Sequence, residues 1–131
     1  MKTFEFRLPA EPTAAAVARA MVEAVGSDLP EPILFDAKLL TTEVVTNAIR
    51  HARGTEAVIV RVKRNRLIRV EVVDQGPMFD PQPHTTSTRA GGGQGLVIVG
   101  AVANAWGVEP DEDGKKVWFE LAAGGGHDVS V

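Results

Sequence analysis

Residues 39–53 read LLTTEVVTNAIRHAR, and this stretch decides the fold because it places polar side chains at helical spacing in an otherwise apolar helix. At about 100° per residue, one stripe holds Glu43, Asn47, Arg50 and His51. The opposite side is mostly apolar and comprises Ala37, Thr41, Val44, Val45, Ala48, Ile49 and Ala52. A carboxylate, an amide, a guanidinium and an imidazole on one face can form a site for a metal-bound anion. The alternative is a solvated polar face, although asparagine is a poor helix former and solvent positions usually hold Lys, Glu or Gln.

The composition predicts one domain over residues 1–122, followed by a flexible tail over residues 123–131. The 131 residues are 44% hydrophobic and 24% charged, which suits a single compact core. A net charge of -3 gives no general attraction to nucleic acid or to an anionic membrane. The absence of cysteine excludes disulfides and thiolate metal sites. No apolar run resembles a signal peptide or a membrane span, so we expect a cytoplasmic protein.

Hydrophobic periodicity predicts the order of helices and strands. Alternation indicates strands over residues 3–8, 57–63, 67–73, 106–109 and 116–121, the last two joined by a turn over residues 111–114. Helices are expected over residues 13–25, from the prolines at 30 and 32 through residue 53, and over about residues 94–105, with Thr13 as the N-cap of the first. This order predicts an α+β fold: a two-layer α/β sandwich whose mixed, mostly antiparallel sheet carries its helices on one face.

The segment over residues 74–95 is a long loop rich in proline and glycine, which is typical of a functional lid. Asp74 ends the strand VEVVD, and its carboxylate could accept a hydrogen bond from an exocyclic amine such as that of adenine. Gly76 would let the backbone approach the ring. An ordinary strand-to-turn Asp-Gly signal is the alternative interpretation.

A glycine run, Gly91-Gly92-Gly93-Gln94-Gly95-Leu96, then opens an apolar helix. Unhindered amides at a helix N-terminus form an anion cradle, whereas a flexible linker would rarely enter such a helix directly. The dinucleotide pattern G-x-G-x-x-G fails in both registers, and the only Gly-Lys pair lacks the upstream glycine of a P-loop. A nucleotide would therefore need another architecture.

Four phrases in this order, EVVTNAIRHA, VEVVDQGP, GGGQGL and WGVEP followed by KVWFEL, resemble the Bergerat-fold (GHKL) ATPases. Within that superfamily the chain is similar to the small, free-standing anti-sigma-factor serine kinases of actinobacterial type. The resemblance covers roughly residues 3 to 121 and implies a histidine-kinase-like ATPase domain that uses ATP and Mg²⁺.

The resemblance also implies a role for each matching residue. Glu43 would be the general base, and Asn47 would complete the Mg²⁺ shell. The remaining nucleotide contacts would come from Arg50, His51, Asp74, Gly76, Gly91, Gly93, Gln94, Gly95, Leu96 and Lys116. Three positions depart from the family pattern: Met78 replaces a glycine, Gln94 stands where arginine is frequent, and Lys115-Lys116 occupies a turn that often carries threonine.

The implied function is an ATP- and Mg²⁺-dependent serine kinase that acts as an anti-sigma factor. It would sequester a sigma factor and phosphorylate an anti-anti-sigma protein, with a homodimer possible and no direct contact to nucleic acid or membrane. One alternative is a binding module that regulates its partners by sequestration alone, with or without ATP. A sensor histidine kinase is a third interpretation, disfavoured because the chain has no room for a dimerisation helix pair.

Overall fold

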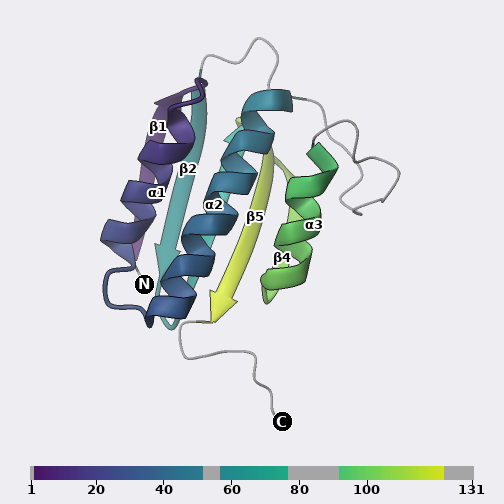
Figure 1. The fold of residues 1–131 in the computed structure, drawn as a ribbon. Coiled ribbons are helices and arrows are strands. Elements are labelled where there is room, and N and C mark those ends of the chain that lie inside the picture. Colours follow the sequence, from purple (N-terminus) through teal and green to yellow (C-terminus); the bar gives the residue numbers. More distant parts are fainter. Residues whose placement is uncertain (1, 52–56, 77–91, 123–131) are drawn as a thin grey trace.

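The chain forms a two-layer α/β sandwich in which three helices cover one face of a five-stranded sheet (Figure 1). The computed structural model describes residues 2–51, 57–76 and 92–122. The helices are α1 (Ala14–Val25), α2 (Glu31–His51) and α3 (Gly92–Val102). The strands are β1 (Lys2–Pro9), β2 (Ala57–Arg64), β3 (Leu67–Asp74), β4 (Ala105–Asp111) and β5 (Gly114–Ala122). None of these three helices is long and apolar enough to cross a membrane.

The strands of the sheet follow the order β1-β2-β3-β5-β4, so the last strand inserts between β3 and β4. Every ladder among the described residues is antiparallel, which confirms the prediction of a mostly antiparallel sheet and adds that these ladders include no parallel pair. The insertion pairs Asp74, the last residue of β3, with Lys115 near the start of β5. The C-terminal end of β3 and the N-terminal end of β5 therefore lie side by side at the same end of the sheet.

The core lies between the inner face of the sheet and the buried sides of the helices. Alternate residues of the central strands are almost fully buried: Val58, Val60, Val62, Ile68, Val70, Val72, Val117, Phe119 and Leu121. They meet apolar residues of α1 and α2, including Val22, Leu40, Val44 and Val45. The period of two in the strands and the helical period of α2 thus bury one face of each element against the other.

The predicted elements are all present, with differences at their ends. Helix α3 begins at Gly92 and ends at Val102. It ends earlier than predicted because the backbone N–H of Asn104 donates to Glu120 O of β5 at 2.9 Å, and not to a carbonyl of the helix. Thr13 precedes α1 as expected, but its side chain makes no capping hydrogen bond. Its backbone already has helical angles, φ -70° and ψ -14°, instead of the extended angles that such a cap requires.

Candidate functional site

The polar stripe of α2 lies at the boundary between the buried and exposed sides of the helix. Asn47 is only 3% exposed, whereas Glu43 is half-buried and Arg50 is exposed. Among the residues that the structure describes, neither the amide nitrogen nor the amide oxygen of Asn47 has a hydrogen-bond partner. Burying an unpaired polar group costs about 1–3 kcal/mol, so an asparagine at this position is a poor structural choice. Its burial argues against the solvated-face interpretation and favours a ligand that supplies the partners.

Asp74 presents a second buried polar group without a partner. Its Oδ1 accepts hydrogen bonds from Gly76 N at 2.6 Å and from Lys115 Nζ at 2.7 Å. Its Oδ2 is buried as well and has no hydrogen-bond partner within the described part of the chain. Two donors therefore fix one oxygen of the carboxylate, and the other oxygen is left to accept a hydrogen bond from a ligand.

Lys115 belongs to this site, although sequence reasoning did not select it. Its side chain is 1% exposed and points to the helix-covered face, as do Val117, Phe119 and Leu121 farther along β5. Gly114 precedes it with a φ of 143°, in the region that favours glycine. A Cβ on Gly114 would lie 2.1 Å from the backbone oxygen of Asp74. This close approach fixes the start of β5 against the end of β3.

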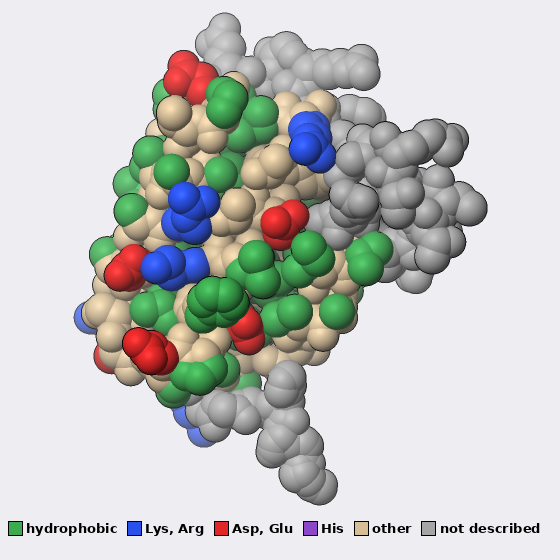
Figure 2. Space-filling model, viewed as in Figure 1, with side chains coloured by type: hydrophobic (Ala, Val, Ile, Leu, Met, Phe, Trp, Pro, Cys, Tyr) green, Lys and Arg blue, Asp and Glu red, His purple; other side chains and the backbone are tan. Residues whose placement is uncertain are grey.

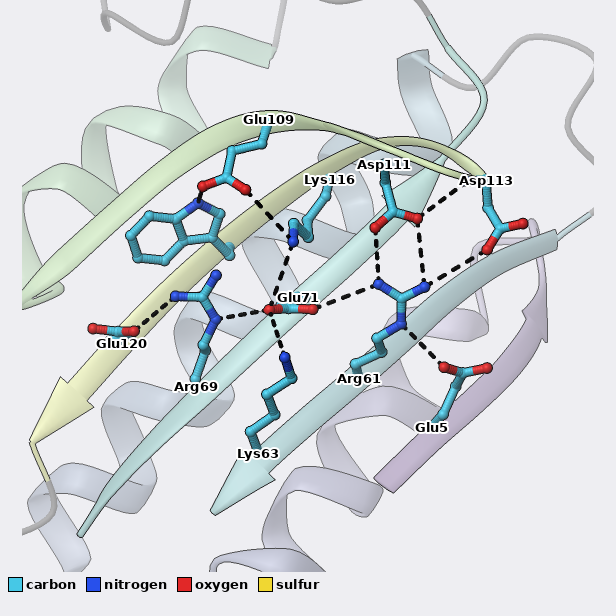
Figure 3. Close-up of polar contacts among 11 residues, drawn as sticks. Glu5, Arg61, Lys63, Arg69, Glu71, Glu109, Asp111, Asp113, Lys116 and Glu120 are labelled. Atoms are coloured by element: carbon cyan, nitrogen blue, oxygen red, sulfur yellow. Dashed lines mark hydrogen bonds and ion pairs between the residues drawn. The ribbon is translucent and has the colours of Figure 1, made fainter. Parts of the chain in front are cut away.

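The structure does not bring Lys116 to Asp74. Because successive strand residues point to opposite faces, the ammonium of Lys116 lies on the outer face of the sheet (Figure 3). There it lies 3.5 Å from Glu109 Oε1 and 3.9 Å from Glu71 Oε2. The charge that was expected from Lys116 near the phosphates is directed away from the site, and Lys115 points inward in its place.

The outer face of the sheet is occupied by a network of ion pairs around Glu71, whose side chain is 1% exposed (Figure 3). Four cations lie within 4 Å of its carboxylate: Arg61, Lys63, Arg69 and Lys116. Burial alone would raise the pKa of Glu71, but the hydrogen bond from Arg69 and the neighbouring lysines outweigh it, so this pKa lies below its ordinary value.

Other charges on this face are paired in the same way. A hydrogen bond to Asp111 raises the pKa of Arg61, and the same contact lowers the pKa of Asp111. Arg69 stacks on the ring of Trp118, 4.1 Å from its centroid. The charges of the outer face therefore satisfy one another, unlike the buried groups of Asn47 and Asp74.

The other predicted contacts lie around the N-terminus of α3 or outside the described residues. Gly93, Gln94 and Gly95 fall in the first turn of α3, where helix amides are free to bind an anion. Leu96 is 4% exposed and belongs to the hydrophobic core. The prediction for Gly91, the departure at Met78 and the tail over residues 123–131 lie outside the described residues, as does the side chain of His51.

These elements meet at one end of the sandwich. Helix α2 packs against α3, β3 and β5, and its C-terminal end lies where β3 ends and α3 begins (Figure 1). On the helix-covered face, acidic and basic side chains are scattered among apolar ones in the part of the chain that the structure describes (Figure 2). Within those residues, no three His, Cys, Asp or Glu side chains form a metal cluster. The amide oxygen of an asparagine can serve as one ligand of a divalent cation.

Asn47 lies near the C-terminal end of α2, Asp74 ends β3, and Gly93, Gln94 and Gly95 lie in the first turn of α3. Residues 8–121 match the family model described as the histidine kinase-like ATPase domain, so the chain belongs to that family. No curated protein matches the chain.

Among solved structures, the chain is similar to the RsbU and RsbW domains of Rv1364c from Mycobacterium tuberculosis, with a TM-score of 0.71 and 17% identity. The match covers 93% of this chain and 32% of that chain, so this chain spans about a third of that protein's length. At this level of identity the likeness confirms the α+β fold, with its helices on one face of an antiparallel sheet.

Proposed function

We propose that the protein is an ATP- and Mg²⁺-dependent protein serine kinase that acts as an anti-sigma factor. The observation that carries the proposal is the pair of buried, unpartnered polar groups at one end of the fold, the Asn47 amide and Asp74 Oδ2. Membership of the histidine kinase-like ATPase family and the motifs shared with anti-sigma-factor kinases support the same assignment.

Asp74 would read the base of the nucleotide. Its Oδ1 is already held by Gly76 N and Lys115 Nζ, so Oδ2 is the atom that can accept from the amino group of adenine. A hydrogen bond to a buried carboxylate contributes more than one between neutral groups. The fixed orientation of the carboxylate would therefore give both affinity and selectivity.

Asn47 would hold the cation, with Oδ1 as the ligand atom and the remaining positions filled by phosphate oxygens and water. The first turn of α3 would bind the phosphates through its backbone amides. ATP with Mg²⁺, when bound, supplies the transferable phosphoryl group and neutralises its charge. The side chains of α2 and the amides of α3 would then position that group for in-line attack.

Glu43 would act as the general base. It lies one helical turn before Asn47 on α2, is half-buried, and makes no hydrogen bond or ion pair with any described residue. Its carboxylate could therefore take the proton from the serine hydroxyl of a partner protein. The substrate serine would belong to an anti-anti-sigma protein, and the sigma factor would bind the same module.

Titration calorimetry with ATP, with and without Mg²⁺, tests the nucleotide part of the proposal. We expect saturable binding that strengthens when Mg²⁺ is added. No heat and no melting shift at millimolar ATP and Mg²⁺ would contradict it and favour regulation by sequestration alone. Capture of partners from the native cell, followed by transfer of labelled γ-phosphate to the retained proteins, tests the kinase part.

A further inference from the structure

We propose that Lys115 is a positioning residue for base recognition, because its ammonium holds Asp74 Oδ1 and so keeps Asp74 Oδ2 facing the 6-amino group of the nucleotide. The inference rests on the proposed function, since it concerns the base end of the same nucleotide site. It requires no contact between Lys115 and the nucleotide. Lys115 acts on the recognition of adenine through the carboxylate of Asp74.

The ion pair between Lys115 and Asp74 is the first support. Lys115 Nζ lies 2.7 Å from Asp74 Oδ1, and the two side chains are 1% and 0% exposed. Each charge is therefore removed from water and lies beside an opposite charge. A buried carboxylate that lacks such a partner is costly to keep in its ionised form. The ammonium of Lys115 thus supplies the counter-charge that a buried anionic acceptor needs.

The hydrogen bonds of Asp74 determine which of its oxygens faces a ligand. Gly76 N donates to Oδ1 at 2.6 Å from the segment that follows β3, and Lys115 Nζ donates to the same oxygen from β5. Two donors from different segments restrict the rotation of the carboxylate. Its Oδ2 is buried and accepts no hydrogen bond from the described residues. Without Lys115, the amide of Gly76 alone would restrict that rotation.

The strand pairing places Lys115 for this contact. Asp74 and Lys115 are direct partners in the ladder between β3 and β5, so their side chains extend to the same face of the sheet. Gly114 has a φ of 143°, and a Cβ on it would lie 2.1 Å from the backbone oxygen of Asp74. The backbone of Lys115 is therefore held at a fixed position relative to Asp74, and its side chain reaches Oδ1 from there.

The test compares ATP with purine riboside 5′-triphosphate, which differs from ATP in lacking the 6-amino group. Calorimetry on the full chain measures the dissociation constants of both nucleotides with Mg²⁺. The ratio of the two constants reports what the amino group contributes, whereas general damage to the site weakens both nucleotides alike. The wild type should bind ATP about tenfold more tightly or better, which is the scale of one hydrogen bond to a charged acceptor.

Lys115→Met should bring this ratio to within about threefold of one, because it removes the cation and the donor that orient Asp74. Asp74→Asn should also abolish the preference for ATP. Adding Lys115→Met to Asp74→Asn should reduce the preference no further, since Lys115 acts through Asp74. A wild-type ratio in folded Lys115→Met would show that Lys115 only stabilises the fold, and would overturn the inference.

Lys116→Met is the matched control. Lys116 is the next residue of the same strand, but its ammonium lies on the outer face, 3.5 Å from Glu109 Oε1. This substitution removes a lysine from β5 without touching Asp74, so the ratio should keep its wild-type value. An equal fall of the ratio in Lys116→Met and Lys115→Met would also overturn the inference, because it would trace the effect to β5 as a whole.

Lys115→Gln replaces Lys115→Met if the latter fails to fold. Its shorter, neutral amide supplies no counter-charge to Asp74, so the ratio should fall in the same way, and an unchanged ratio would overturn the inference. A wild type that binds both nucleotides equally contradicts base reading by Asp74, and the inference with it. A wild type that binds neither nucleotide contradicts the proposed function itself, so the failures are distinguishable.

Discussion

Gly114 and Asp74 are in such close contact that a methyl group on Gly114 would lie 2.1 Å from the backbone oxygen of Asp74. The contact joins the turn between β4 and β5 to the end of β3, and Gly114 makes it at a φ of 143°. The backbone at the start of β5 thus sets the position of Asp74, whose carboxylate we propose as the acceptor for the nucleotide base. Any side chain at Gly114 must move either the turn or that residue.

Gly114→Ala should therefore lower both stability and nucleotide affinity. The strained φ and the backbone clash together should cost about 2 kcal/mol or more in the free energy of unfolding. Chemical denaturation and ATP titration check the two effects. Gly100→Ala in α3 is the control: its Cβ would lie 3.3 Å from Trp106 Nε1, so we expect a change within about 1 kcal/mol of either sign. Equal effects in the two variants would contradict a special role for Gly114.

Asn47→Leu should stabilise the protein and abolish the Mg²⁺ dependence of ATP binding. The substitution replaces two buried, unpartnered polar atoms by an apolar group of similar size, which should raise the free energy of unfolding by about 1–2 kcal/mol. Thermal unfolding and calorimetry measure the two changes.

Asn104→Leu provides the contrast for Asn47. Asn104 Oδ1 accepts a hydrogen bond from Ala122 N at 2.9 Å, so this substitution should destabilise the fold without affecting Mg²⁺-ATP. A loss of stability in Asn47→Leu would mean that Asn47 is structural, which contradicts its assignment as a ligand.

Glu71→Gln should lower stability at neutral pH by about 1–3 kcal/mol, because it removes the carboxylate that four cations share at the centre of the outer face. The pKa of Glu71 is lowered in the folded state, so its contribution is complete above the ordinary value of 4.5. That contribution is lost as the pH falls through the folded value.

Unfolding of the wild type and of Glu71→Gln should therefore differ at pH 7 and converge progressively below about pH 4.5. Urea denaturation at a series of pH values measures the difference. Glu23→Gln, which breaks an exposed pair with Lys38, should change stability by less than about 1 kcal/mol at any pH. A difference between the wild type and Glu71→Gln that does not vary with pH would contradict the electrostatic explanation.

The sequence predicts which face of each helix or strand is buried better than it predicts which strands pair with one another. Alternation in β5 and helical spacing in α2 follow directly from which residues are apolar, and both were confirmed. The position of β5 between β3 and β4 depends on pairing between residues far apart in the sequence, and local hydrophobic periodicity does not predict such pairing. Nothing in the local sequence pattern therefore predicts that Lys115 lies beside Asp74.

A shift of two residues in one strand boundary explains why the sequence analysis selected Lys116 and not Lys115. The prediction begins the last strand at Lys116, which leaves Lys115 in the turn, whereas β5 begins at Gly114. With the observed boundary, Lys115 shares a face with Val117 and Phe119, and Lys116 points to the opposite face. The burial of Asn47 without partners was equally hidden, because it depends on packing around α2.

The substitution Glu43→Gln distinguishes a kinase from a module that only binds its partners. If Glu43 is the general base, this variant should retain ATP affinity and partner binding while phosphoryl transfer slows by roughly 10²-fold or more. Glu31→Gln, an exposed carboxylate in the first turn of the same helix, should leave the rate unchanged. Transfer to the cognate partner must be measured in a single turnover at saturating ATP, so that a binding defect is not mistaken for a chemical one. A wild-type rate in Glu43→Gln would remove Glu43 from the mechanism, and Asn47 and the amides of α3 would remain as a site that binds nucleotide without this base.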